Sequence, residues 1–157
     1  MKNYRSGKFW LLLLLAPFFI QGVCNKDNED LENPNEDEYV TWNISGANGS
    51  LSSTTDSLGF YKQDNSSSMY GMTKTNPRSS FDLSFNGLTK GTYPAEYFNV
   101  SADGKNFTSS STPLQVNIST YGSSGGYVTG TYNGNIQDAA TSAIIAVNGK
   151  FHLKIKN

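Results

Sequence analysis

The chain has 157 residues, with 12 basic and 13 acidic side chains, one histidine and one cysteine. A single cysteine excludes an intramolecular disulfide and a cysteine-rich zinc site, and a net charge of −1 argues against the dense basic surface of a nucleic-acid-binding protein. The charges are unevenly distributed, however, and their distribution divides the chain into three parts.

The first part, residues 1–23, has the composition of a secretory signal peptide. Three basic residues lie within the first eight positions, and the uncharged run Phe9–Ile20 follows. As a helix, this run would span about 18 Å, well short of the roughly 30 Å hydrocarbon core of a membrane. We therefore expect a cleaved signal rather than a membrane-spanning anchor.

Cys24, the only cysteine, lies directly after this segment and before an acidic run. In this setting it resembles the acylated N-terminal cysteine of surface lipoproteins of Bacteroidota. The resemblance implies lipid attachment at Cys24 and membrane association in the cell envelope, as an outer-membrane lipoprotein that is periplasmic or surface-exposed. Val23 stands where such proteins usually have a small residue. Cleavage after Gly22, which would leave Cys24 as a free thiol, is the alternative.

The second part, residues 24–38, is strongly acidic. It contains seven acids, one base and a single large apolar residue, Leu31. Such a composition buries too little apolar surface to offset the entropy of ordering the chain, and repulsion between like charges extends it further. We expect a disordered tether that leads to a folded domain at residues 39–157.

Alternation of apolar and polar residues predicts β-strands throughout this third part. The period of two is clearest at 40–44, 81–85, 114–118 and 151–155. Weaker candidates lie at 58–62, 68–74, 96–101, 106–110 and 127–136. The best helical candidate, 136–143, is a turn or two at most. The pattern predicts an all-β fold, namely an antiparallel β-sandwich of about 8–10 strands, with a small closed β-barrel as the alternative.

Asn148-Gly149 separates two apolar stretches near the C-terminus. Asn-Gly readily adopts the positive φ angles that a two-residue type I′ turn requires. We therefore predict a tight turn at Asn148-Gly149 that joins the last two strands as a hairpin.

The C-terminal segments GYVTGTYNGNIQD and AIIAVNGKFHLKI, together with the Gly-Thr-Tyr step at 91–93, resemble small Bacteroidota lipoprotein domains of unknown function. This resemblance implies a β-sandwich and a location in the cell envelope, and it supplies no catalytic residue. In the same bacteria, Asp56-Ser57-Leu58 resembles the acceptor triplet for O-glycosylation, which makes Ser57 a candidate modification site.

Residue types that carry catalysis are scarce. His152, the only histidine, lies among lysines on the last predicted strand, so we expect it to face solvent. Only six acids are spread over residues 39–157. We expect no enzymatic activity, no metal and no cofactor.

Aromatic residues are frequent and include nine tyrosines. An exposed tyrosine offers a flat apolar face and a hydroxyl, which suits stacking on sugars or binding a protein partner. The candidate ligand-binding residues near predicted strand ends or loops are Tyr61, Tyr70, Tyr97, Tyr121 and Tyr127. The alternative is that most of them pack at the edges of the core, because aromatic residues are good strand formers.

Two functional hypotheses follow for the exported protein. It is a non-catalytic binding module for a glycan or protein ligand, or a structural or accessory lipoprotein subunit of a larger envelope assembly. Neither hypothesis has a nucleic-acid partner. A row of exposed aromatic residues beside Asn, Asp or Gln on one sheet favours the first. A large flat patch or an unpaired, uncharged edge strand favours the second.

Overall fold

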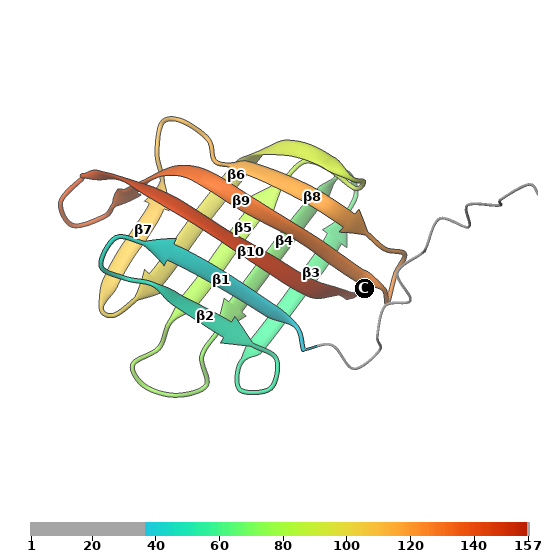
Figure 1. Ribbon diagram of the computed structural model, residues 1–157, viewed down its shortest axis with the longest axis horizontal. Helices are drawn as coiled ribbons and strands as arrows, with labels where there is room; N and C mark the ends of the chain where they lie inside the picture. The colour runs from blue at the N-terminus through green and yellow to red at the C-terminus, as the bar shows by residue number, and fades with distance from the viewer. Residues whose placement is uncertain (1–36, 157) are drawn as a thin grey trace, which may run out of the picture. The chain divides into compact units, whose positions relative to one another are not determined.

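The computed structural model describes residues 37–156 (Figure 1). All ten regular elements in this part of the chain are β-strands, which confirms the all-β prediction. In chain order they are β1 (Tyr39–Ile44), β2 (Gly49–Ser52), β3 (Ser57–Gln63), β4 (Ser66–Met72), β5 (Ser80–Phe85), β6 (Gly91–Ala102), β7 (Lys105–Ser109), β8 (Gln115–Tyr121), β9 (Tyr127–Asp138) and β10 (Ile144–Lys156). The predicted signal segment and Cys24 lie outside the described residues.

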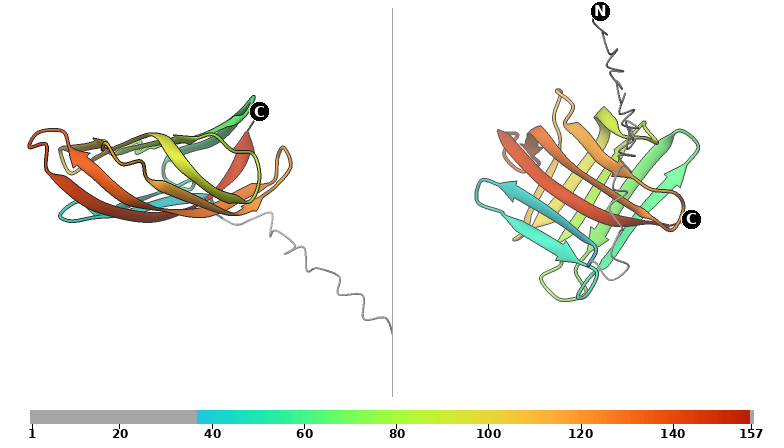
Figure 2. Two further views of the ribbon diagram at one scale, coloured as in Figure 1. Left: turned by 90° about the horizontal axis from the view of Figure 1, so that it is seen from above. Right: turned by 45° about the vertical axis from the view of Figure 1, so that its right-hand side comes forward.

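The strands form one mixed sheet in the order β2-β1-β10-β3-β4-β5-β6-β7-β9-β8, with additional pairings of β10 with β9 and of β6 with β8. Among these pairs only β10 and β3 are parallel. The sheet folds over into two facing layers, a sandwich-like arrangement (Figures 1 and 2). We call β1, β2, β8, β9 and β10 the front layer, and β3, β4, β5 and the second half of β6 the back layer.

The long strand β6 passes from one layer to the other. Its first residues, Gly91 to Pro94, pair with β8 of the front layer. Its later residues, from Ala95 on, pair with β5 of the back layer. One strand thereby joins the two layers, which have their apolar faces toward each other.

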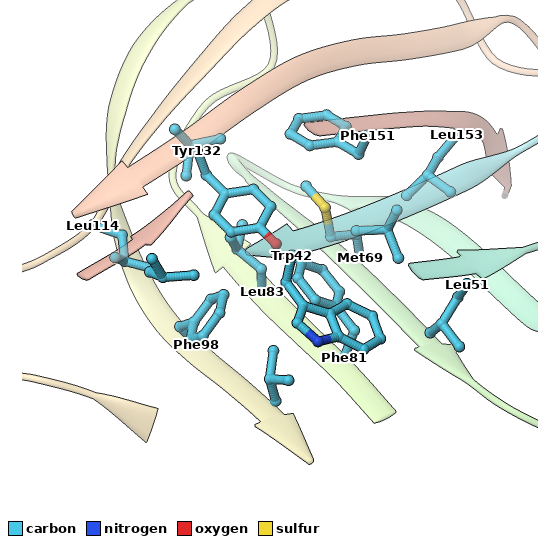
Figure 3. Close-up of a cluster of buried hydrophobic side chains, with 14 of the residues drawn as sticks. Trp42, Leu51, Met69, Phe81, Leu83, Phe98, Leu114, Tyr132, Phe151 and Leu153 are labelled. Carbon is cyan, nitrogen blue, oxygen red and sulfur yellow. The ribbon is translucent and has the colours of Figure 1, made fainter. Parts of the chain in front are cut away.

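Inward-facing apolar residues from both layers form the core (Figure 3). The four clearest alternating segments place their apolar residues there, as predicted. Phe81 of the back layer stacks on Trp42 of the front layer, with ring centroids 6.4 Å apart. The same ring meets Phe98 edge-on at 5.8 Å and Tyr132 at 5.6 Å. These aromatic contacts bridge the layers and fix how one lies over the other.

The predicted hairpin turn at Asn148-Gly149 is wrong. β10 continues through these residues, and Gly149 lies between Trp42 of β1 and Tyr132 of β9 in the sheet register. A Cβ atom at Gly149 would collide with the carbonyl oxygen of Thr41 and with the Tyr132 ring. The Tyr132 hydroxyl reaches across β10 and donates a 2.6 Å hydrogen bond to the Thr41 carbonyl. This glycine therefore provides space inside a sheet rather than a turn.

The turn between β9 and β10 lies instead at residues 139–143, within the segment considered as a short helix. The Asp138 carboxylate accepts hydrogen bonds from the backbone N–H groups of Ala140 at 2.8 Å and Thr141 at 3.1 Å. These two bonds, that of Thr141 first, hold the pKa of Asp138 below its usual value. A side-chain-to-backbone turn thus replaces the expected Asn-Gly turn.

Glu38, assigned to the tether by its charge, is attached to the folded domain. Its backbone N–H donates to Ser53 Oγ at 3.0 Å, and its carbonyl accepts from the Ser53 N–H at 2.8 Å. Its carboxylate accepts a hydrogen bond from the backbone N–H of Lys154 at 3.1 Å. The ordered domain therefore includes at least this residue before β1.

Candidate functional site

The outer surface of the back layer carries the most distinctive group of exposed side chains. On each strand of this layer, residues alternate between the core and this surface. Phe60, Met69, Leu83 and Phe98 point inward and are fully buried. The outward positions between them carry Tyr61, Tyr70, Asp82, Tyr97 and Asn99, which we call the tyrosine face.

Tyr61 and Tyr70 form the centre of this face. The β3–β4 hairpin places Tyr61 opposite Ser68 and Tyr70 opposite Gly59, so the two tyrosines are diagonal neighbours. Their rings are nearly parallel, with centroids 5.6 Å apart and 12° between the planes. Their hydroxyls lie 3.3 Å apart. This hydrogen bond, with a smaller contribution from burial, raises the pKa of Tyr61. The two rings therefore form one stacked aromatic pair on the outer surface.

Gly59 explains why the rings lie close to the sheet. A Cβ atom at this position would be 2.6 Å from Cε2 of Tyr61 and 3.0 Å from Cε1 of Tyr70. Both rings thus cover bare backbone, and Gly59 is buried by them although it faces outward. A glycine within a strand often marks such a close approach.

Tyr97 and two polar residues extend the face across β5 and β6. Tyr70 lies opposite Asp82, and Asp82 lies opposite Asn99. In the neighbouring row, Ser68 is opposite Ser84 and Ser84 opposite Tyr97. Two strand spacings, roughly 10 Å, therefore separate β4 and its Tyr70 from β6 and its Tyr97. Tyr70 is 42% exposed and Tyr97 is 47% exposed, so both rings are accessible.

Asp82 is the acid of this face. Burial raises the pKa of its carboxyl. No hydrogen bond or ion pair joins its side chain to another described residue. When ionised, the carboxylate can therefore accept hydrogen bonds from a ligand that lies against the neighbouring tyrosines.

An open hollow of about 460 Å³ adjoins Tyr70 at one end of the face. It is lined by Ser57, Tyr70, Met72, Thr73, Lys74 and Arg78. The candidate glycosylation site, Ser57, is exposed at the start of β3 and forms part of this lining. Ser57 therefore lies at the border of the hollow.

The other two candidate tyrosines lie elsewhere. Tyr121 is half-buried, meets Phe60 edge-on at 5.9 Å and has its hydroxyl 3.1 Å from Ser67 Oγ. Tyr127 is only 6% exposed, which corrects its assignment as an outward residue. The structure thus brings Tyr61, Tyr70 and Tyr97 onto one face and separates the remaining two from it.

His152 does not face solvent, contrary to the expectation from its position among lysines. It is 8% exposed and stacks on Tyr127, with ring centroids 4.5 Å apart. Tyr39 covers it from the other side at 6.0 Å, and its Nδ1 lies 2.9 Å from Thr129 Oγ1. Aromatic residues on both neighbouring strands therefore bury a position that the alternation alone places outside.

The sequence pattern did not indicate the remaining residues of the site, which are Gly59, Asp82, Asn99, Lys74 and Arg78. The turn at Asp64-Asn65 was a signal for one of them, because counting back from this turn places Gly59 opposite Tyr70. The positions of the other residues depend on how β4, β5 and β6 pair, and longer connections join these strands. No turn close in sequence specifies that pairing.

Neither a metal site nor a spanning helix is present in the described part of the chain. Within residues 37–156 no group of three or more His, Cys, Asp or Glu side chains is placed to hold a metal ion. No helix there is long and apolar enough to cross a membrane. The tyrosine face offers aromatic rings for stacking and polar groups for hydrogen bonding.

The fold and this face define an all-β domain with an exposed aromatic and polar surface on one layer. No protein family model matches the chain, and no curated protein or solved structure shows significant similarity to it.

Proposed function

We propose that this protein is an exported, lipid-anchored envelope protein whose β-domain binds glycans, without catalysis, through the tyrosine face. The observation that carries the proposal is the stacked Tyr61–Tyr70 pair beside Asp82. A pyranose ring has an apolar C–H face, which stacks on aromatic rings, and hydroxyls at its rim, which hydrogen-bond to carboxylates and amides. The face offers both kinds of contact on neighbouring strands.

The arrangement suits a short extended chain of sugars better than a single one. Tyr70 and Tyr97 are on strands roughly 10 Å apart, about the length of two linked sugar rings. Small serines, Ser68 and Ser84, lie in the row that leads to Tyr97. A glycan lying across the strands would therefore meet an aromatic ring at each end and little obstruction between them.

The envelope location in this proposal depends on the sequence. The signal segment, the acidic tether and Cys24 support it, as does the resemblance to Bacteroidota lipoproteins. Mass determination of the mature N-terminus tests it. An acylated Cys24 is the expected result, and an unmodified chain starting at Val23 would remove the anchor while leaving glycan binding to be judged separately.

A glycan array probed with the full chain in detergent tests the binding function. We expect binding that Tyr70→Ala and Tyr97→Ala each weaken by roughly tenfold or more, about 1.4 kcal/mol, because each change removes a stacking surface. Ile144→Ala is the matched control, since Ile144 is 58% exposed and lies off the tyrosine face. Equal binding by all these variants would contradict the proposal.

The second candidate function, an accessory subunit of an envelope assembly, has a different observation in its favour. β2 is at one end of the strand order and pairs only with β1. Its four residues, Gly49–Ser52, carry no charge. An uncharged edge strand can accept a strand from another protein. Capture of a stoichiometric envelope partner that Ser50→Pro abolishes, together with an empty glycan array, would favour this function.

A further inference from the structure

The hollow beside Tyr70 is positively charged. Lys74 and Arg78 are the two charged residues of its lining, and both are cations. The other lining residues are uncharged, and two of them, Tyr70 and Met72, are large, with exposed fractions of 42% and 43%. The lining of the hollow thus combines apolar surface with two cations.

The β4–β5 connection contains both cations. Its base is closed by a hydrogen bond from the Thr73 N–H to the Ser79 carbonyl at 2.9 Å and by one from the Ser79 N–H to Thr73 Oγ1 at 2.8 Å. Lys74 and Arg78 are the next residues on each side of this closed base. Among the described residues, neither cation forms an ion pair with an acid.

The nearby acids leave this positive charge unneutralised. Asp56 accepts hydrogen bonds from the Ser52 N–H at 3.0 Å and from Thr55 Oγ1 at 2.9 Å, within the β2–β3 turn. Asp82 lies in the row of Tyr70, whereas the hollow extends past Met72 toward Lys74. The charge therefore changes sign along the site, from Asp82 at one end to two cations at the other.

We propose that the glycan bound by the tyrosine face is acidic, and that its anionic group, a uronic-acid carboxylate or a sulfate ester, lies between Lys74 and Arg78. The sugar ring that carries this group stacks on Tyr70, and a neutral ring beyond it hydrogen-bonds to Asp82. This inference rests on the proposed function and adds the substrate class to it.

The charges favour an acidic sugar over a denser polyanion. Residues 39–157 contain eight bases against six acids, so no broad basic surface is available for a nucleic acid. The Asp82 carboxylate would repel a ligand with charges at every position. One anionic group on a ring that otherwise carries hydroxyls fits both ends of the site.

Matched pairs of ligands test this inference. A hyaluronan tetrasaccharide, which carries a carboxylate on alternate sugars, is compared with its methyl ester. A κ-carrageenan tetrasaccharide, which carries a sulfate on alternate sugars, is compared with its desulfated form. Each ligand is titrated calorimetrically against the full chain in detergent. We expect the free acid or the sulfate to bind about tenfold more tightly than its neutral partner, and this advantage to shrink as salt is raised. The pair whose charged member gains more affinity over its neutral partner identifies the anionic group as a carboxylate or a sulfate.

Two charge variants complete the test. Lys74→Ala/Arg78→Ala is expected to weaken binding of the charged ligand by about tenfold, to the affinity of the neutral one. Lys90→Ala/Lys154→Ala removes the same charge from exposed positions elsewhere and should leave the preference intact. Equal affinity for both members of each pair, or equal losses in the two variants, overturns the acidic-glycan inference alone. Absence of binding to all four ligands and to the glycan array overturns the proposed function as well.

Discussion

Both outer surfaces of this domain carry aromatic residues, but they use them differently. On the front layer, Tyr39 and Tyr127 cover His152, and Lys150 Nζ lies 5.5 Å from the centre of the Tyr39 ring. These side chains pack mainly against one another. On the back layer, Tyr70 and Tyr97 remain accessible, with 42% and 47% of their surfaces exposed.

The difference lies in the neighbours rather than in the tyrosines. In the front layer, His152 of β10 lies between Tyr39 of β1 and Tyr127 of β9, and the three rings pack together. In the back layer, the positions opposite Tyr70, Tyr61 and Tyr97 are held by Gly59, Ser68 and Ser84. Small partners leave ring faces open, so small residues shape the tyrosine face as much as the aromatic ones do.

The largest contrast is expected between two glycines, one in each layer. Gly149→Ala should destabilise the domain by about 3 kcal/mol or more, because its Cβ atom meets the Thr41 backbone and the buried Tyr132 ring. Gly59→Ala meets only the far ends of two accessible tyrosines and should cost less than about 1 kcal/mol. Urea unfolding measures both.

For glycan affinity, the order of the two substitutions should be reversed, with the larger loss in Gly59→Ala. Gly59→Ala displaces the Tyr61–Tyr70 pair and should weaken binding, although it touches no ligand itself. A Gly59→Ala variant with unchanged affinity would show that the close placement of the two rings over Gly59 is irrelevant to recognition.

Substitutions of Tyr127 and Tyr70 should likewise differ in their effects on stability and on glycan affinity. Tyr127→Ala removes a buried ring from its stack with His152 and should cost about 3 kcal/mol of stability. Tyr70→Ala removes a ring that is 42% exposed and should cost much less, while it reduces glycan affinity. Thermal unfolding and calorimetric titration of the same two preparations test this, and similar stability losses would contradict the assignment of the two faces.

A smaller effect concerns Tyr132 and alkaline pH. Burial raises the pKa of the Tyr132 hydroxyl far above its usual value near 10. The unfolded chain therefore releases this proton first, and stability should fall by up to about 1.4 kcal/mol per pH unit above pH 10. In Tyr132→Phe this contribution disappears, and loss of the hydrogen bond to Thr41 costs about 1 kcal/mol at neutral pH. Urea unfolding of both proteins at pH 8 and pH 11 measures the difference, and parallel pH slopes would refute it.

The smallest effect on stability, and the most specific, is expected at Asp82. Because burial raises its pKa in the folded state, ionisation of Asp82 weakens the fold as pH rises through that range. Asp82→Asn should therefore leave stability at pH 7 unchanged or slightly higher, while it reduces glycan binding. Wild-type binding should also decline as the pH falls toward the raised pKa of Asp82, and the variant should lack this decline. A structural role for Asp82 would instead predict loss of stability in the variant.

Much of the fold could be predicted from local pattern. The alternation at 81–85 and 151–155 placed Phe81 and Phe151 in the core correctly, because a half-buried strand exposes only one of its two faces. The turn predicted at Asn148-Gly149 was wrong because the same dipeptide occurs both in tight turns and in the crowded interior of a strand. Only the position of Tyr132 on another strand distinguishes the two cases.

The site was harder to predict than the fold. Tyr61 and Tyr70 follow from one hairpin, so their proximity is encoded within a dozen residues. Tyr97 joins them only through the β5–β6 pairing, which contains an irregularity between Ser84 and Phe85 that shifts the register. The burial of His152 depends on β1, which is more than a hundred residues earlier in the chain.

The central place of β10 has a consequence for when the domain can fold. This 13-residue strand pairs with β1, β9 and β3, and it follows all the other described strands in the chain. Until it emerges, β1 has only the four-residue β2 as a partner. Such late, long-range pairing makes folding slow, so the domain should become compact only after its last described strand has been synthesised. Under the export proposed above, this delay would keep the chain unfolded for passage through a secretion channel.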